Sequence, residues 1–232
     1  MKLSILMMVL CMTTLHAQNT QNTQRPSDAS PFQIGLNAGF AYRTAPLSDE
    51  IQDDFRQYAQ NLKSGVCFGL DLNYNIKPQW GIGAKYLQFH SVNTLNFNGV
   101  NPDGSARREK GTDKVNIRFM GPTYFARMPL ANNRHILSGT LGLGYMSYSL
   151  KSEFRADYQK LSGGTFGTTF ELGYDYQLNK TLSIGAQLGG ATGVLNKVTF
   201  DDGSNTEEIT LEGDNRENLS FLHIGGGLKL SL

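Results

Sequence analysis

Cysteine is scarce in this chain, which has two cysteines in 232 residues, Cys11 and Cys67. Cys11 lies in an N-terminal segment that we expect to be removed, so Cys67 would stand alone and no internal disulfide is predicted. We expect Cys67 to be a small residue in the wall of the fold rather than a reactive thiol.

An excess of charge of either sign is also absent, because 21 lysines and arginines stand against 20 aspartates and glutamates. The basic residues gather only at Arg107, Arg108 and Lys110, so we expect no nucleic-acid partner. No stretch reaches 18 consecutive apolar residues, which excludes a membrane-spanning helix. A membrane protein is still compatible with this composition, because barrel strands alternate apolar with polar residues.

The first 17 residues have the pattern of a secretory signal peptide. Lys2 precedes an apolar run over residues 3–12, and the segment ends in the small residue Ala17. We therefore expect residues 1–17 to direct export and to be cleaved off.

Residues 18–31 are polar and repeat Gln-Asn-Thr, which is typical of a flexible segment and predicts a periplasmic tail. Nothing after them resembles a boundary between independent cores. Residues 32–232 are therefore expected to form one domain.

What the sequence does contain is alternation of apolar and polar residues. Near the end, Leu228, Leu230 and Leu232 alternate with Lys229 and Ser231. Successive side chains of a strand point to opposite faces, so one face would meet lipid and the other the inside of a barrel. Eight stretches show the pattern: 32–43, 66–77, 80–89, 114–127, 135–145, 166–178, 182–189 and 222–232.

Short and long connections alternate between these stretches. Short turns near 77–79, 128–134 and 179–180 are expected on the periplasmic side. Long loops are expected to face outward, near 44–64, 94–113, 151–163 and 195–217. An even number of strands with this alternation predicts an all-β fold, an antiparallel up-and-down eight-stranded transmembrane β-barrel.

Two of the strands break the alternation. In the third, the apolar positions shift from Tyr86 to Leu87 and Phe89, which predicts a bulge. In the fourth, we expect the odd-numbered apolar residues of 115–119 to face lipid. We also expect Gly121-Pro122 to interrupt pairing and form a second bulge.

The chain resembles the small outer-membrane β-barrels common in Bacteroidota, the OmpA-like and PorT-like barrels. The resemblance rests on the signal ending at Ala17, the Gly-rich segments 184–190 and 224–228, and the amphipathic last strand, and it extends over nearly all of 32–232. It implies an architecture in a Gram-negative outer membrane rather than an activity.

Charged residues fall at positions expected to face inward. An eight-stranded barrel has an interior barely wide enough for its side chains, so charges there must pair. We predict a side-chain-filled lumen with a structural charge network, and a narrow path for ions or small solutes is the alternative. The network comprises Arg43, Asp71, Lys85, Arg118, Glu171, Asp175, His223 and Lys229. No metal site or cofactor is predicted, because the histidines are scattered.

His90-Ser91 invites comparison with lipid A deacylases, which use a histidine, a serine and an acid facing the lipid. Adjacent strand residues point to opposite faces, so the pair could act on one ester only if a bulge intervened. We therefore expect no catalytic residues and no enzyme, and keep a lipid-modifying enzyme as the second alternative.

Two loops carry further signals. In the first loop Ser48 can cap a helix whose apolar residues recur with helical spacing from Ile51 to Leu62, so a short amphipathic helix is predicted over the barrel mouth. The last loop holds seven carboxylates around Asp202-Gly203, which predicts a solvated acidic hairpin above the membrane.

Together these features predict a barrel of the cell outer membrane with a structural or surface-interaction role. The expected partners are outer-membrane lipid and lipopolysaccharide, the barrel-assembly machinery and an extracellular ligand bound through the long loops.

Overall fold

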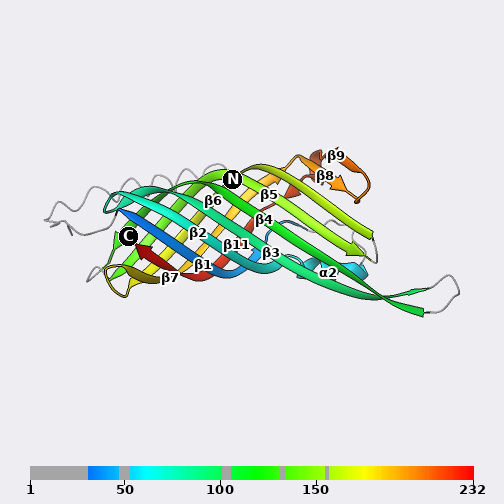
Figure 1. Ribbon diagram of the computed structural model, residues 1–232, viewed down its shortest axis with the longest axis horizontal. Coiled ribbons are helices and arrows are strands. Elements are labelled where there is room, and N and C mark those ends of the chain that lie inside the picture. Colours follow the sequence, from blue (N-terminus) through cyan, green and yellow to red (C-terminus); the bar gives the residue numbers. More distant parts are fainter. Residues whose placement is uncertain (1–30, 47–52, 101–105, 131–133, 155–156) are drawn as a thin grey trace.

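The described residues of the computed structural model, 31–46, 53–100, 106–130, 134–154 and 157–232, form an antiparallel barrel (Figure 1). The expected signal peptide and nearly all of the expected tail lie outside them. The elements are β1 (Phe32–Arg43), α2 (Asp53–Asn61), β2 (Ser64–Lys77), β3 (Trp80–Val100), β4 (Ala106–Pro129), β5 (His135–Phe154), β6 (Asp157–Gln177), β7 (Leu182–Leu195), β8 (Lys197–Asp201), β9 (Thr206–Thr210), the 3-10 helix η2 (Gly213–Asn215), β10 (Glu217–Asn218) and β11 (Phe221–Ser231).

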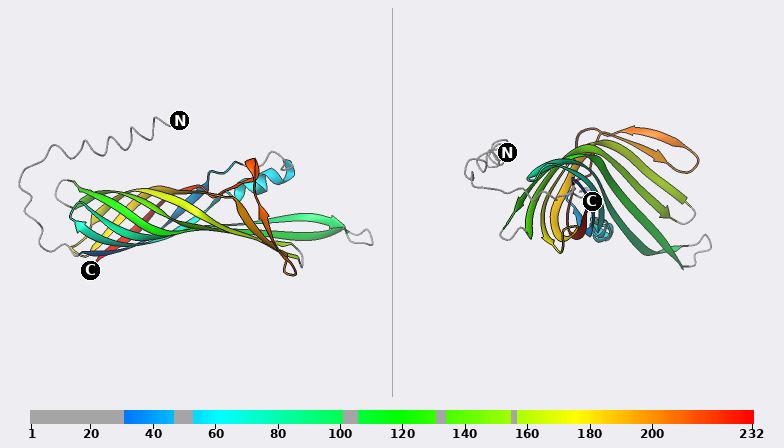
Figure 2. Two further views of the ribbon diagram at one scale, coloured as in Figure 1. Left: turned by 90° about the horizontal axis from the view of Figure 1, so that it is seen from above. Right: turned by 60° about the vertical axis from the view of Figure 1, so that its left-hand side comes forward.

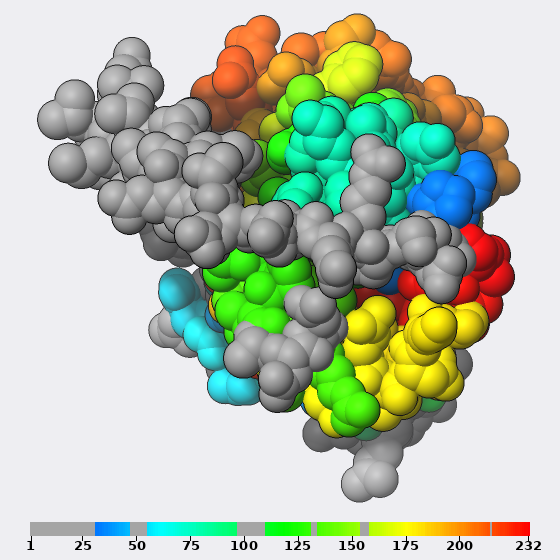
Figure 3. All heavy atoms as spheres, turned by 90° about the vertical axis from the view of Figure 1, so that its left-hand side faces the viewer, coloured from blue at the N-terminus to red at the C-terminus, as the bar shows by residue number. Residues whose placement is uncertain are grey.

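Eight of these strands close a ring. Each strand from β1 to β6 pairs with the next, β7 pairs with β11, and β11 returns to β1 with Gln33 opposite Ser231. The eight-stranded antiparallel barrel is therefore confirmed. Figure 3 looks onto the end with the short turns, where the ends of β3, β1, β11, β7 and β4 follow one another around the rim.

The tight turn expected at Asn179-Lys180 joins β6 to β7. There the Asn179 side-chain oxygen accepts hydrogen bonds from the backbone N–H groups of Thr181 and Leu182, each at 2.8 Å. This side-chain bonding is a local reason for asparagine in the turn.

The strands β3 to β6 are 20 to 24 residues long and extend well beyond the ring (Figures 1 and 2). The prediction of loops at 94–113 and 151–163 is therefore wrong for most of these residues, which continue the strands. Their polar composition reflects water around the projecting sheet rather than an absence of pairing.

The other two long connections match their predictions more closely. The acidic segment forms the hairpin β8–β9, and Gly203 in its turn has a φ of 86°, which favours glycine. The first loop contains the expected helix as α2, while Ser48 to Ile51 lie outside the described residues.

No helix in the described part of the chain is both long and apolar enough to cross a bilayer.

Neither predicted bulge is present. The ladder between β3 and β4 runs without a shift from Trp80 opposite Ala126 to Val100 opposite Ala106. Gly121 and Pro122 are skipped in the ladder to β5, as expected for a proline without an N–H, but the register is the same on both sides of them.

The apolar residues of β3 and β4 on which the two bulge predictions rested therefore face inward. Leu87, Phe89, Ile117 and Phe119 are fully buried and Val115 nearly so, which corrects the expectation that the residues of β4 face lipid. The strands are regular, and the surroundings of their outer face change along their length. Toward the short turns the outer face meets lipid, whereas farther along it meets water and the apolar residues move inside.

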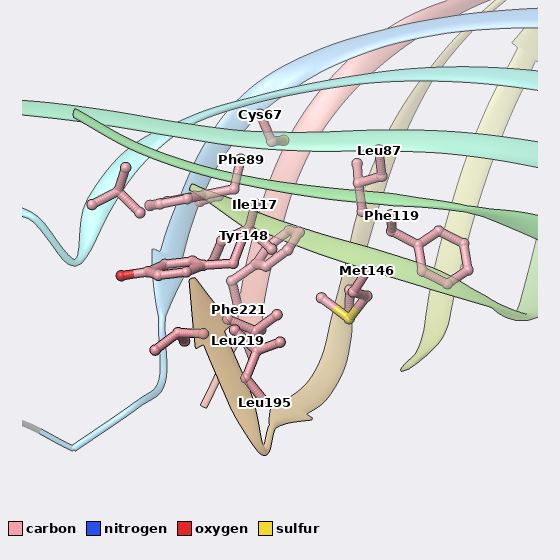
Figure 4. Packing of buried hydrophobic residues seen from close by; sticks show 14 residues of the cluster. Cys67, Leu87, Phe89, Ile117, Phe119, Met146, Tyr148, Leu195, Leu219 and Phe221 are labelled. Atoms are coloured by element: carbon pink, nitrogen blue, oxygen red, sulfur yellow. The ribbon is translucent and has the colours of Figure 1, made fainter. Parts of the chain in front are cut away.

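A hydrophobic core accordingly fills the barrel on the side of the long connections. Figure 4 shows Phe89, Ile117, Met146 and Phe221 pointing toward one another from β3, β4, β5 and β11. Leu195 at the end of β7 joins them. Cys67 lies in the same cluster as a buried free thiol, in the wall position predicted for it.

Candidate functional site in the barrel interior

A buried ion network crosses the barrel below the hydrophobic core. Lys85 on β3 is only 1% exposed, and its Nζ lies 2.7 Å from Asp71 Oδ1 and 3.0 Å from Glu171 Oε2. Asp71 is the direct neighbour of Lys85 on β2, whereas Glu171 comes from β6, three strands from β3 around the ring. One ammonium thus connects strands that are not neighbours in the sheet.

Two further side chains complete this network. Asn37 on β1 donates a hydrogen bond of 3.0 Å from Nδ2 to Asp71 Oδ2. His223 on β11 is 2% exposed, and its Nε2 lies 3.8 Å from Glu171 Oε2. Neither ring nitrogen of His223 has a hydrogen-bond partner among the described residues.

Gly189 on β7 creates the space in which His223 and Glu171 meet. It pairs with both residues in the sheet, and an added Cβ would lie 2.8 Å from His223 Nε2 and 2.5 Å from the Phe170 carbonyl oxygen. The glycine therefore allows two large polar side chains to lie side by side in a narrow barrel.

A second ion pair lies closer to the short turns. Lys229 on β11 donates to Asp175 on β6 at 2.6 Å. A gap of about 10 Å³ beside the pair, lined also by Asn37 and Gln187, has room for about one water molecule. The interior is filled by side chains at this level too.

Arg43 occupies the opposite end of the interior. Its guanidinium donates to Glu217 of β10 at 2.6 Å and to the Asn218 carbonyl at 3.1 Å, and it lies 5.8 Å from the centre of the Tyr148 ring. Arg43 therefore ties the last long connection to the rim.

Seven of the eight predicted network residues thus face inward, but they form three separate groups. Asp71, Lys85, Glu171 and His223 are together, Asp175 pairs with Lys229, and Arg43 lies beyond the hydrophobic core.

Arg118 is the exception, because it is exposed on the outer face of β4. The prediction assigned β4 the opposite facing, so it placed Arg118 inside and overlooked Arg127. Arg127 donates inside the barrel to Asn75 at 3.0 Å. The predicted network consisted of charged residues alone and therefore lacked neutral partners such as Asn37.

His90 and Ser91 lie on opposite faces of β3. Ser91 points inward and donates to the Ser64 carbonyl at 2.7 Å, whereas His90 Nδ1 is 2.8 Å from Asn116 Oδ1 on the outer face. The described residues contain no group of three or more histidine, cysteine or acidic residues that could hold a metal ion.

Comparisons with known proteins agree with this architecture. The chain is similar to Neisserial surface protein A, with 10% identity and a TM-score of 0.50 over 89% of this chain and 100% of that one. It is similar to a major outer membrane protein from Thermus thermophilus, with 12% identity and a TM-score of 0.50 over 86% of this chain and 98% of that one. At these identities the likeness concerns the fold alone.

No curated protein sequence matches the chain. The family model described as outer membrane protein beta-barrel domain matches residues 7–228. The chain belongs to the outer-membrane β-barrel family, whose place is the outer membrane.

Proposed function

We propose that this protein is a sealed outer-membrane barrel with a structural or surface-interaction role, carried by the sheet that projects beyond the membrane. The observation that supports this most is the hydrophobic core inside the barrel. Phe89, Ile117, Phe119 and Met146 are fully buried between the polar network and the outer mouth. A dry apolar layer opposes the passage of ions, because an ion entering it would lose its hydration.

The proposal includes export and orientation. Residues 1–17 would act as the signal peptide, and N-terminal sequencing of the protein isolated from membranes should then begin at Gln18. The short turns would face the periplasm, where the assembly machinery acts, and the projecting sheet would meet extracellular ligands. The Gly-rich strands support a Bacteroidota type of barrel.

The experiment that tests the sealed lumen is a conductance measurement on the full exported chain in a planar bilayer. We expect no discrete steps from the folded wild-type protein. A variant with Phe89→Ala, Phe119→Ala and Phe221→Ala should conduct, because it opens the core at three facing strands. Arg118→Ala is the matched control and should be silent, since Arg118 lies outside the barrel.

Heat-modifiable electrophoretic mobility would establish that each variant is a folded barrel. Discrete steps from the wild-type protein that change in Asp71→Asn or Glu171→Gln would overturn the proposal and support the narrow channel instead.

The proposal includes no enzymatic activity. Because Ser91 is inside the wall and His90 outside, the pair cannot reach one lipid ester together. Replacing His90 with Ala should leave the lipid A mass spectrum of the producing cells unchanged. A shift by one acyl chain between wild type and variant would support a lipid-modifying enzyme.

A further inference from the structure

The apolar outer face of the barrel has a clear upper edge on the wall formed by β3 to β6. Tyr86, Met120, Tyr145 and Phe166 lie opposite one another on these four strands. Phe166 is 85% exposed and Met120 65% exposed, as expected for side chains that meet lipid. This row therefore marks where lipid chains end on this wall.

Basic residues occupy the same outer face beyond this edge. Arg118 lies two residues beyond Met120 on β4, and Lys114 lies four residues farther. Lys114 is opposite Lys151 on β5, which in turn is opposite Lys160 on β6. The register thus aligns three lysines across three neighbouring strands, and we call these and Arg118 the basic row.

The spacing of the basic row suits a group that carries more than one phosphate. Neighbouring strands are about 4.8 Å apart, so the Cα atoms of Lys114, Lys151 and Lys160 fall within about 10 Å. Lysine side chains are long and place their ammonium groups at the headgroup level of a membrane. Several ammonium groups can therefore reach one headgroup at the same time.

Acidic residues neutralise only part of the basic row. Lys114 Nζ is 2.8 Å from Glu153 Oε1 in an exposed pair, and the charge of Lys151 also acts on this carboxylate, more weakly than that of Lys114. Asp201 lies opposite Lys160, but its Oδ1 accepts a hydrogen bond from the Gly203 N–H.

Within the described part of the chain, the other members of the row have no partner in direct contact. Arg118, Lys151 and Lys160 make no hydrogen bond or ion pair with any described residue. Four cations and two carboxylates leave a net positive surface.

Single cations also lie elsewhere at this end of the barrel, such as Lys63, whose Nζ is 5.1 Å from the centre of the exposed Tyr42 ring on β1, whereas the basic row aligns three lysines across neighbouring strands. On the adjoining strand β7, which pairs with β6, the outward residues Thr192 and Val194 are uncharged, and Thr192 pairs with Ser220 at 2.8 Å.

From this placement we infer that the basic row binds the phosphate groups of an anionic outer-leaflet lipid headgroup. The inference rests on the proposed orientation, in which this end of the barrel faces the outer leaflet. Phosphate oxygens complement lysine and arginine. The apolar row of Tyr86 and Phe166 would contact the acyl chains, Arg118 lies just beyond it, and the three lysines lie six residues beyond it, about 20 Å along the strands, and reach back toward it with their long side chains.

The test uses the full chain in detergent and titrates bisphosphorylated lipid A, monophosphorylated lipid A and phosphatidylcholine, with bound lipid counted by native mass spectrometry. We expect tightest binding of the bisphosphorylated lipid. Lys151→Gln with Lys160→Gln should weaken it about 25-fold, from roughly fivefold for each cation at a lipid surface.

Two variants separate charge from structure. Lys151→Arg with Lys160→Arg should retain wild-type binding, since the charge remains. Lys63→Gln with Arg216→Gln removes two positive charges at the same end of the barrel but beside β1 and β7, away from the basic row, and should change nothing. Equal binding of all three lipids, equal binding by the glutamine variant, or displacement by millimolar inorganic phosphate would each overturn the inference.

This outcome is independent of the sealed lumen. Conductance depends on residues inside the wall, and the basic row lies outside it, so either proposal can fail while the other stands.

Discussion

At the scale of single residues, Lys85 determines the charge balance of the interior. It is the cation between Asp71 and Glu171, and all three side chains are at most about a tenth exposed. Burying charges is costly unless they are paired, and removal of one partner leaves the others without compensation.

We therefore expect Lys85→Met to lower the free energy of unfolding by about 3–5 kcal/mol. The triple variant Asp71→Asn, Lys85→Met, Glu171→Gln should recover most of this loss, because no unpaired charge then remains in this group. Urea unfolding in detergent, followed by the fluorescence of the single tryptophan, Trp80, measures both.

Lys197→Met is the control for this prediction. Its pair with Glu208 is more than half exposed, so the change should cost less than about 1 kcal/mol. If Lys85→Met were no more destabilised than Lys197→Met, the interior network would have no part in stability.

At the scale of elements, α2 is held on the projecting part of β3 by a reciprocal pair of hydrogen bonds. The Tyr58 hydroxyl donates to the Asn93 carbonyl at 3.2 Å, and Asn93 Nδ2 donates to the Tyr58 carbonyl at 3.0 Å. Burial, and after it the carboxylate of Asp113, raise the pKa of Tyr58 well above its usual range.

This shift predicts how the docking of α2 depends on pH. An undocked Tyr58 loses its proton near pH 10, whereas the docked residue keeps it, so the docked state binds more protons at high pH. Docking should therefore be complete below about pH 10 and weaken as the pH rises above it. Amide hydrogen exchange over residues 53–61, corrected for its intrinsic pH dependence, should show protection at pH 8 and less at pH 10.5.

Tyr58→Phe tests the origin of this effect. It should lower the protection of α2 at pH 8 and remove the further change at pH 10.5. Tyr158→Phe, on β6, should behave as wild type. A pH step that persists in Tyr58→Phe would mean that another group controls the docking.

At the scale of the whole molecule, the barrel has two ends with different surroundings. Figure 2 shows the hairpin β3–β4, α2 and β8–β9 at the end opposite the short turns. The outer face is apolar near the short turns and polar beyond the row of Tyr86 and Met120. This division predicts that the hairpin β8–β9 lies outside the cell.

An epitope inserted after Gly203 should therefore bind antibody on intact cells, because this glycine has open space around it and the turn is exposed. The same epitope placed directly before Phe32 should bind only after the outer membrane is permeabilised. Labelling of both on intact cells, or of the second alone, would contradict the orientation.

The sequence by itself determined the number of membrane strands, their antiparallel order and the facing of most of them. In the lipid-facing parts of β5, β6, β7 and β11 the alternation identifies the outward apolar residues, because one face of each strand meets lipid there. The inward positions of Asp71, Lys85, Glu171 and His223 follow from the same alternation.

Only the tertiary structure decided how Leu87, Phe89, Ile117 and Phe119 face. The alternation records which side of a strand is apolar, and this side changes where the strand leaves lipid and enters water. A shift of phase in sequence therefore has two physical causes, a bulge or a change of solvent, and only the continuous register of β3 and β4 distinguishes them. The same ambiguity led to the wrong prediction that Arg118 faces inward, whereas the structure has it in the basic row on the outer face.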